Sequence, residues 1–214
     1  VLEDGDNIVV TVSPTDIDAG ASLTVTVTTN NGSLFPDGTI TVSPETGVTG
    51  VERTITMNPP DNQNGTADIF VYVTDGMETV TQQFSATVTA ENDAPTITST
   101  AVTSVNEDAA YSYTITASDV DGNTLTYSAL DPLPDWLEFN TSTHILSSIA
   151  GQPDNSNVGE HSVTLRVNDG TVNVDQGFTI TVINTNDTPV LDTIDNPSAV
   201  SEDGANIVVS VTPT

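Results

Sequence analysis

The chain has 214 residues, with 30 carboxylates against two Lys or Arg side chains, and its formal net charge is −28 at pH 7. Such a polyanion cannot neutralise phosphates, which argues against nucleic-acid binding and against docking onto anionic lipid. There are no cysteines, and no apolar stretch approaches the ~20 residues of a membrane span, so we expect neither disulfides nor membrane insertion. The length allows two domains with cores of their own. Because the first residue is Val1, we expect a fragment of a longer protein.

The sequence repeats itself with a period of about 95 residues, the signature of a tandem array. Residues 1–15 recur at 200–214 with 11 of 15 positions identical, and a weaker copy opens at Val105. Near the ends of the repeats, residues 71–76 match 165–170 and residues 90–95 match 184–189, both at an offset of 94. We therefore expect repeat 1 at residues 1–93, lacking its opening strand, repeat 2 at 94–187, and the N-terminal part of repeat 3 at 188–214.

Within each repeat, apolar residues alternate with period two, as in strands that bury one face. In chain order, the inward-facing residues of the expected strands are Ile8, Val10 and Val12; Leu23, Val25 and Val27; Ile69, Val71 and Val73; Phe84, Ala86 and Val88; Tyr111, Tyr113, Ile115 and Ala117; Val163, Leu165 and Val167; and Phe178, Ile180 and Val182. No segment has a convincing helical period. About seven short strands per repeat, separated by turn residues, predict an all-β fold of tandem seven-stranded Greek-key, immunoglobulin-like β-sandwiches arranged end to end.

Many carboxylates gather at the expected strand ends. In such a sandwich, the loop after the second strand and the loop before the last strand lie at one end, here called the crown. The opening turn, the loop between the fourth and fifth strands and the exit lie at the other end, here called the base. The crown of repeat 2 then carries Asp119, Asp121 and Asp169, and the base of repeat 1, which faces it, carries Glu3, Asp61, Glu91 and Asp93.

Carboxylates that converge on one junction repel one another unless a cation lies between them. Calcium suits such a cluster because it accepts about six to eight oxygen ligands in flexible geometry. Zinc or copper would need His or Cys, and the two histidines, His144 and His161, lie outside these clusters. The sequence therefore predicts a calcium site where repeat 1 meets repeat 2.

Several motifs resemble the cadherin repeat: Ala-x-Asp-x-Asp-Gly-Asn at 117–123 with Tyr127-Ser128 after it, the Asp-Gly turn before the last strand, and the Asn-Asp-Ala-Pro exit at 92–95. Residues 133–147 resemble the LP-x-WL-x-F…TG-x-LS signature of the dystroglycan-type cadherin-like variant, with His144 in place of the usual Gly. Repeats 1 and 3 resemble the tandem repeats of very long bacterial surface adhesins. The resemblance covers nearly all of the chain.

The resemblance implies which residues bind calcium. The implied ligands at the first junction are Glu3, Glu91, Asp93, Asp119, Asp121 and Asp169, with Asp4, Asp61, Asn92 and Asn123 as second choices. The implied partial outer sites are Asp16, Asp18 and Asp75 at the crown of repeat 1, and Glu107, Asp154, Asn186 and Asp187 at the base of repeat 2. The family's Leu-Asp-Arg-Glu motif is missing, with Pro60-Asp61 and Pro153-Asp154 nearest its place, so fewer or weaker ions per junction are expected.

Two classes of function remain. In the first, the repeats are calcium-binding structural extenders of a secreted or cell-surface adhesin, in which Ca²⁺ rigidifies the junction between neighbouring repeats of the same chain. In the second, a repeat is a ligand-binding module for carbohydrate or for a homophilic cadherin-like contact with another adhesin. The acidity could also be a halophile's adaptation that binds no specific ion.

Catalysis is not expected, because no nucleophile elbow or phosphate loop occurs and aromatics make up only 5% of the chain. Trp136 is expected to fill the core.

The missing opening strand of repeat 1 suggests one further hypothesis. Residues 188–214 of a neighbouring molecule could complement repeat 1, head to tail, as swapped strands do.

Overall fold

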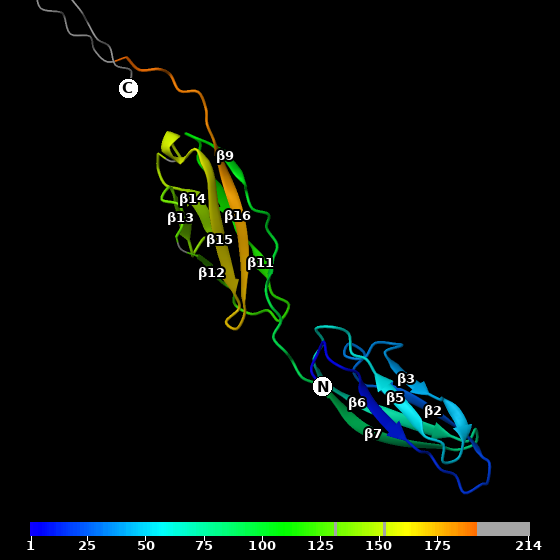
Figure 1. Ribbon diagram of the computed structural model, residues 1–214. Helices are drawn as coiled ribbons and strands as arrows, with labels where there is room; N and C mark the ends of the chain where they lie inside the picture. Colours follow the sequence, from blue (N-terminus) through cyan, green and yellow to red (C-terminus); the bar gives the residue numbers. More distant parts are fainter. Residues whose placement is uncertain (131, 152, 192–214) are drawn as a thin grey trace, which may run out of the picture. The chain divides into compact units, whose positions relative to one another are not determined.

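The computed structural model describes residues 1–130, 132–151 and 153–191 (Figure 1). The described residues form β-strands and one short 3₁₀ turn, η1 (Asn155–Asn157), so the predicted all-β class is confirmed. Among these residues, no helix has the length and apolar character that a membrane crossing requires. Residues 192–214, which make up most of the predicted repeat 3, lie outside the described residues.

The first sandwich comprises seven strands in two antiparallel sheets. The strands are β1 (Ile8–Val12), β2 (Ser22–Thr29), β3 (Ile40–Ser43), β4 (Thr46–Val48), β5 (Arg53–Met57), β6 (Gly65–Thr74) and β7 (Thr79–Val88). One sheet has the order β1-β5-β3 and the other the order β4-β2-β6-β7. β1 and β7 therefore each form the edge of a sheet, with a partner strand on one side only.

The predicted alternation accounts for the core of this sandwich. Val25 on β2 and Ile69 on β6 are fully buried, and Ile8, Val10 and Val12 of β1 pack against them from the other sheet. Val9, one residue out of step, is 58% exposed. Side chains on successive strand residues point to opposite faces, so a one-residue slip of β1 would exchange its buried and exposed faces. The period-two pattern therefore fixes which face of each strand packs inward.

The second sandwich contains more strands than expected, and β8 to β14 are each no longer than 4 residues. The strands are β8 (Thr96–Ile97), β9 (Ser104–Asn106), β10 (Ser112–Thr114), β11 (Ala117–Ser118), β12 (Thr126–Ala129), β13 (Leu137–Asn140), β14 (Ile145–Ser148), β15 (Gly159–Asn168) and β16 (Asn173–Ile183). The sheet orders are β10-β14-β13, β11-β8 and β12-β15-β16-β9. The opening strand is divided because it changes sheets: β8 pairs antiparallel with β11, and β9 pairs parallel with β16.

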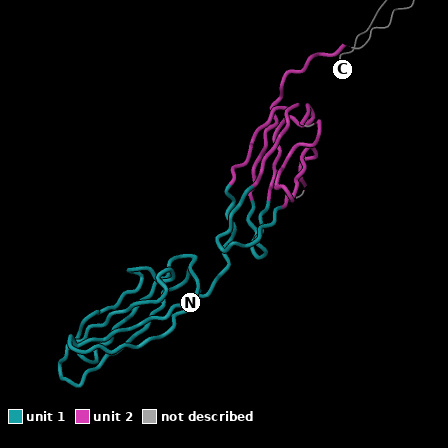
Figure 2. The backbone as a smooth tube through the Cα atoms, turned by 180° about the vertical axis from the view of Figure 1, so that it is seen from behind, with its two compact units in different colours: residues 1–98, 116–127, 166–175 teal, residues 99–115, 128–165, 176–214 magenta. Residues whose placement is uncertain are grey.

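The backbone forms two compact units that do not coincide with the two sandwiches (Figure 2). The first unit contains residues 1–98 together with residues 116–127 and 166–175. Of the described residues, the second unit contains those within 99–115, 128–165 and 176–191. The crown of repeat 2 thus belongs to the same compact unit as the whole of repeat 1. The repeat boundaries at residues 93 and 187 stay predictions.

Candidate metal centre

The base of repeat 1 is organised around Glu3, a carboxylate that is only 1% exposed. Leu2 forms a parallel bridge with Thr89, and the Glu3 N–H donates to the Thr89 carbonyl at 2.9 Å. The Glu3 side chain then accepts two hydrogen bonds, at Oε1 from the Glu91 N–H (2.9 Å) and at Oε2 from Asn64 Nδ2 (3.0 Å). A single buried carboxylate therefore ties the beginning of the repeat to its end and to the loop before β6.

The sequence analysis missed Asn64. It chose Asp61 in the same loop, and the structure leaves Asp61 exposed while Asn64 donates to Glu3. The sequence did contain a signal that pointed to Asn64, because the Pro-Asp-Asn-x-Asn pattern at 60–64 recurs at 153–157 with its second Asn retained. An amide can donate to a buried carboxylate, whereas a second carboxylate in that place would repel it.

Replacing Asn64 with Ala is expected to destabilise the protein by about 1–3 kcal/mol, because it leaves a buried oxygen of Glu3 without a donor. The matched control is Gln63→Ala, since Gln63 is exposed and donates only to the neighbouring Asn62 carbonyl. That variant should change the free energy of unfolding by less than about 0.5 kcal/mol. Urea unfolding of both variants in EDTA measures the difference, and equal stabilities would contradict the structural role given to Asn64.

The crown of repeat 2 holds its carboxylates in tight turns. Asp119 Oδ1 accepts from the Asn123 N–H at 3.1 Å. Asp169 is 7% exposed, and its Oδ1 accepts from the N–H groups of Thr171 and Val172, both at 2.6 Å. Backbone donors of each turn thus fix one oxygen of the carboxylate and leave the second oxygen for other partners.

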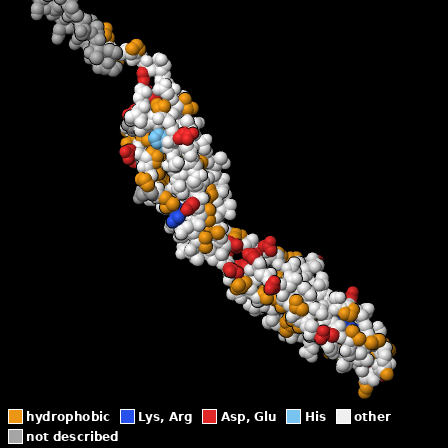
Figure 3. Space-filling view, viewed as in Figure 1, with side chains coloured by type: hydrophobic (Ala, Val, Ile, Leu, Met, Phe, Trp, Pro, Cys, Tyr) orange, Lys and Arg blue, Asp and Glu red, His pale blue; other side chains and the backbone are white. Residues whose placement is uncertain are grey.

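Contacts inside the first compact unit join this crown to the exit of repeat 1. The Asp93 N–H donates to Asp121 Oδ2 at 2.8 Å, and Asn92 Nδ2 donates to Asp169 Oδ2 at 2.9 Å. Asn123 Nδ2 in turn donates to Asn92 Oδ1 at 2.8 Å. A hollow beside these contacts is lined by Asn64, Ala90, Glu91, Asn92, Asp121 and Asn123. Figure 3 shows that acidic side chains gather closely at one place on the visible face.

The electrostatics at Asp93 show how concentrated the negative charge is. Burial raises the pKa of the Asp93 carboxyl above its usual value, and nearby charges raise that pKa further. These charges are the carboxylates of Asp4, Asp121, Glu3 and Asp119. Oδ2 of Asp93 and Oδ2 of Asp119 are buried, and neither has a hydrogen-bond partner among the described residues. Two buried anionic oxygens without donors are costly unless something positive lies against them.

The pKa of Asp169, in contrast, lies below its usual value. The largest cause is the hydrogen bond from Asn92, followed by that from the Val172 N–H. The ionised form of Asp169 is therefore stabilised by donors of the protein itself, while the ionised form of Asp93 is destabilised by burial and by the neighbouring carboxylates. The two carboxylates differ because only one of them faces N–H groups.

The base of repeat 2 repeats the construction found around Glu3. Glu107 is 2% exposed, its N–H donates to the Ile183 carbonyl at 3.0 Å, and its Oε1 accepts from Asn184 Nδ2 at 2.9 Å and from the Thr185 N–H. Oε2 of Glu107 is buried without a partner among the described residues. Asn186 Nδ2 donates to the Asp187 carbonyl at 3.0 Å, as Asn92 Nδ2 does to the Asp93 carbonyl at 2.9 Å. In the loop of this base, Asn155 Nδ2 donates to Asp187 Oδ2, and the Ser156 N–H donates to Asp154 Oδ1 at 2.9 Å.

The crown of repeat 1 likewise repeats the turns of the second crown. Asp75 Oδ1 accepts from the N–H groups of Glu78 (2.7 Å) and Met77 (2.8 Å), and these bonds lower the pKa of Asp75. In the other loop, the Asp18 N–H donates to Asp16 Oδ1 at 2.8 Å. Asp75 thus occupies the same kind of turn as Asp169, whereas the loop of Asp16 differs from that of Asp119, which accepts from the residue four positions on.

The structure brings most of the predicted ligands of the first junction together. Glu91 takes part through its backbone N–H, which donates to Glu3, while its own side chain is exposed. Among the residues that the structure describes, no three His, Asp or Glu side chains are already arranged to hold a metal ion. The donor set nevertheless fits a hard cation, since it consists of carboxylate and amide oxygens and includes two buried oxygens with no donor. The assignment of these residues as ligands stays a prediction.

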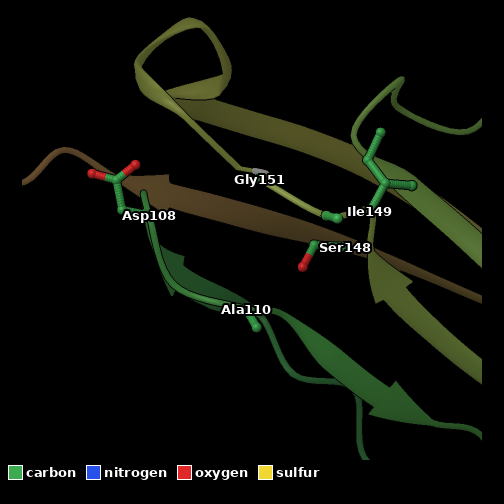
Figure 4. A pocket seen from close by; sticks show the side chains of 6 residues that line it. Asp108, Ala110, Ser148, Ile149 and Gly151 are labelled. Atoms are coloured by element: carbon green, nitrogen blue, oxygen red, sulfur yellow. The ribbon is translucent and has the colours of Figure 1, made fainter.

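A different hollow lies in the second compact unit. Its lining residues are Asp108, Ala110, Ser148, Ile149, Ala150 and Gly151. The Ser148 hydroxyl already accepts a hydrogen bond from the Tyr111 N–H at 3.0 Å. In Figure 4 the side chains of Asp108 and Ser148 point in different directions, so they do not converge on one ligand.

Comparisons with solved structures give matches of low similarity. An endo-fucoidan hydrolase of glycoside hydrolase family 107 is 22% identical, with a TM-score of 0.37, and the match covers 84% of this chain and 26% of that one. Human protocadherin-24 EC1-2 is 19% identical, with a TM-score of 0.42, and the match covers 80% of this chain and 85% of that one. Protocadherin gamma B2 domains 3-6 are 14% identical, with a TM-score of 0.45 and coverages of 91% and 55%. This chain spans about a quarter of the length of the fucoidan hydrolases that it matches.

A comparison with curated proteins finds no match. In the comparison with family models, residues 94–183 match the family described as "Putative Ig domain". These residues extend from just before β8 to the last residue of β16, so the match covers the second sandwich from its first strand to its last. The second sandwich therefore has an immunoglobulin-like fold, in agreement with the fold class predicted from its strands.

Proposed function

We propose that these repeats are calcium-binding structural extenders of a secreted or cell-surface adhesin, and that Ca²⁺ rigidifies the junction between repeat 1 and repeat 2. One observation carries the proposal: Oδ2 of Asp93 and Oδ2 of Asp119 are buried without donors, close to further carboxylates. A bound cation stabilises such a cluster without changing its protonation, and an all-oxygen donor set favours calcium over zinc or copper.

The residues with oxygens available to the ion are Asp93 and Asp119, joined by Asp121 and Asp169. Asp121 and Asp169 accept hydrogen bonds from the Asp93 N–H and from Asn92, so ion binding has to compete with these two bonds. Glu3 is held by two donors of its own repeat and fixes the position of the exit segment. Calcium supplies the positive charge that this cluster otherwise lacks.

An extracellular location follows from the same proposal. Weak calcium sites in extracellular modules have dissociation constants of about 10⁻⁴–10⁻³ M, and millimolar calcium outside cells fills such sites. A chain with a net charge of −28 repels itself strongly when its carboxylates are not neutralised. Calcium would therefore convert a self-repelling chain into a stiff spacer only after export.

Isothermal titration calorimetry tests the calcium site. The variant Asp119→Ala/Asp121→Ala removes two predicted ligands of the first junction and should lose most of the binding heat. The matched control is Asp16→Ala/Asp18→Ala, which alters the equivalent loop of repeat 1, outside the first junction. The control should retain most of the heat, and equal binding by both variants and the wild type would refute the site.

The alternative function, a carbohydrate-binding module, lacks a comparable observation. Such modules stack sugars on exposed aromatic rings, and the single tryptophan, Trp136, is 1% exposed.

A further inference from the structure

The larger sheet of the first sandwich turns a nearly uncharged surface away from the core. Side chains alternate along a strand, so the residues between the core residues point outward. On β4, β2, β6 and β7 these residues, here called the outer face, are Thr46 and Val48; Ser22, Thr24, Thr26 and Thr28; Thr66, Asp68, Phe70, Tyr72 and Thr74; and Thr79, Thr81, Gln83, Ser85 and Thr87. Among them only Asp68 is charged, in a chain with 30 carboxylates.

The one charge of the outer face is held by its neighbours. Asp68 Oδ1 accepts from Ser85 Oγ at 2.9 Å, and Asp68 Oδ2 accepts from Asn30 Nδ2 at 3.2 Å. Both carboxylate oxygens therefore have a donor. Asp68 also lies near the beginning of β6, so the rest of that central strand, from Phe70 to Thr74, presents no charge on this side.

The centre of the outer face is aromatic. Phe70 and Tyr72 lie on β6, between β2 and β7 (Figure 1). On β7, Gln83 is paired with Phe70 and Thr81 with Tyr72. The Tyr72 hydroxyl also accepts a hydrogen bond from Thr28 Oγ1 on β2 at 3.4 Å. Both rings are half-buried by these neighbours, so part of each ring is still open to a partner.

The second sandwich carries an ion pair at the corresponding place. At the offset of 94, Tyr72 and Thr81 correspond to Arg166 and Asp175. Arg166 donates to both oxygens of Asp175, from Nε at 2.7 Å and from Nη2 at 2.8 Å, and the two side chains are 34% and 38% exposed. Such a pair is stable in water and costly to bury. Repeat 1 thus has an uncharged pair, which can leave water more easily, where repeat 2 has a charged pair.

The neighbouring pair differs in size between the two repeats. Phe70 and Gln83 take the places of Thr164 and Gly177 in repeat 2. The second sandwich forms the corresponding strands, β15 and β16, with these smaller side chains. The fold itself therefore does not require the two larger side chains of repeat 1, and their surface is available for a contact with another molecule.

Charge restricts what can cover the outer face. A basic partner is attracted to acidic surfaces of this chain and gains little from an uncharged one. A second copy of the chain carries the same net charge of −28, so two copies approach each other most closely where neither presents charge. A two-fold axis places the outer face of one copy on the same face of the other, as in an isologous interface. The aromatic centres of the two faces then meet, sheet on sheet.

The size of the outer face sets the strength of such a contact. β6 and β7 have 10 residues each and β2 has 8. At about 3.3 Å per residue and about 4.8 Å between strands, these three strands cover about 400–500 Å² per copy. A total of about 800–1,000 Å² lies at the lower end of specific interfaces, which predicts a weak dimer that exchanges with monomer.

The smaller sheet of repeat 1 is a poorer candidate for the same contact. The strands β1, β5 and β3 have only 4 or 5 residues each, so their outward side covers about half the area. This side is also uncharged, but it carries no aromatic residue; its outward side chains are Val9, Thr11, Thr41, Ser43, Thr54 and Thr56. It therefore serves as the internal control.

We infer that two copies of this chain associate through the outer face of repeat 1, in a two-fold contact centred on Phe70 and Tyr72. The strands of this face run from the base of the repeat to its crown, so the two repeats lie side by side in the contact. None of the predicted calcium ligands belongs to the outer face. The contact is therefore a binding function separate from the proposed role as a structural extender.

Exchanging one residue pair between the repeats tests the contact. Tyr72→Arg/Thr81→Asp gives the outer face the ion pair of repeat 2, and because it adds one positive and one negative charge, the net charge stays at −28. In sedimentation equilibrium in EDTA, at concentrations up to about 1 mM, the wild type should dimerise and this variant should bind at least about tenfold more weakly. Phe70→Thr, which introduces the residue of repeat 2, should also weaken the dimer.

The matched control places the same ion pair on the smaller sheet. Thr11 and Thr54 are paired on neighbouring strands, so Thr11→Arg/Thr54→Asp adds the same two charges on the other side of repeat 1. This variant should dimerise as the wild type does. Urea unfolding of each variant distinguishes a lost contact from a lost fold. A wild type that stays monomeric at the highest concentration, or equal dimerisation by the wild type and the folded Tyr72→Arg/Thr81→Asp variant, would overturn the inference.

Cross-linking through one introduced cysteine tests the two-fold symmetry, because the chain has no cysteine of its own. An isologous contact presents the same residue on both copies, so a single variant is sufficient. Packed sheets lie about 10 Å apart, and a short bis-maleimide should therefore join two copies of Gln83→Cys. Thr41→Cys, on the smaller sheet, should give several-fold less covalent dimer, and equal yields would contradict the contact. Because all of these measurements are made in EDTA, their outcome does not depend on the calcium site.

Discussion

Millimolar calcium is expected to raise the melting temperature of the chain by roughly 2–11 °C over its value in EDTA. A ligand that binds only the folded state stabilises it by RT ln(1 + [L]/Kd), which for millimolar calcium is about 0.4 kcal/mol at a Kd of about 10⁻³ M and about 1.4 kcal/mol at a Kd of about 10⁻⁴ M. For a domain of about 100 residues, each kcal/mol corresponds to about 4–8 °C. Differential scanning calorimetry in EDTA and in CaCl₂ measures the shift. If NaCl of matched ionic strength raised the melting temperature equally, general charge screening, as in a halophile's protein, would explain the stabilisation and the calcium site would be refuted.

The substitution Asp93→Asn tests the cause of this shift. A carboxyl whose pKa is raised in the folded state contributes stability at low pH, and this stability is lost as the pH rises through the raised pKa. At neutral pH the asparagine mimics the protonated form, so the variant should melt at a higher temperature than the wild type in EDTA and gain less from calcium.

Asp75→Asn is the control of opposite sign. The hydrogen bonds from the Glu78 and Met77 N–H groups lower the pKa of Asp75, so its contribution to stability is present at neutral pH and lost as the pH falls through the lowered pKa. This variant should melt at a lower temperature than the wild type in EDTA and gain as much from calcium as the wild type does. Two variants that shift in the same direction in EDTA would contradict the electrostatic account.

Replacing Trp136 with Ala should destabilise the protein by about 3–5 kcal/mol, the usual cost of removing a large buried aromatic side chain. Trp136 is 1% exposed and packs edge to face against Tyr111 and His161, with ring centroids 6.0 Å and 5.4 Å away. Urea unfolding measures the loss, and Trp136→Phe, which retains an aromatic ring, should lose less.

The same two variants separate a core role from sugar recognition. A residue that stacks on a sugar would change glycan binding with little change in the free energy of unfolding. If Trp136→Ala abolished binding on a glycan array and kept the stability of the wild type, the carbohydrate-binding function would be favoured over the proposed role as a structural extender. The burial of Trp136 predicts the opposite result. Trp136→Ala should lose much of its free energy of unfolding, and the wild type should give no glycan-binding signal.

The strands of the fold were predictable because burial follows the period of two. The run Leu23, Val25, Val27 forms the inner face of β2, and Val163, Leu165 and Val167 are buried along β15. The division of the opening strand into β8 and β9 was not predictable, since it depends on which sheet offers a free edge at each point. Local pattern decides the face of a strand, whereas tertiary pairing decides where the strand ends.

The candidate site was predictable where charge and turn residues coincide. The Asp-x-Asp and Asp-Gly patterns identified Asp119 and Asp169, which the structure joins to the exit of repeat 1 through Asn92 and Asn123. The role of Asn64 was missed because a neutral amide gives no charge signal. His161 is half-buried and packs against Trp136. The sequence did not indicate this contact, since an alternating run does not reveal which aromatic neighbour lies across the core.

The parallel pairing at the ends of each repeat has a mechanical consequence. β9, near the start of the second sandwich, runs parallel to β16 at its end, from Ser104↔Thr181 to Asn106↔Ile183, and Leu2 is bridged to Thr89 in the same sense. A pull on the two ends of the chain draws two parallel strands past each other along their length. Their hydrogen bonds are then loaded in shear and must break together, whereas bonds in a hairpin peel apart one by one. Each repeat should therefore resist tension better than its modest core suggests.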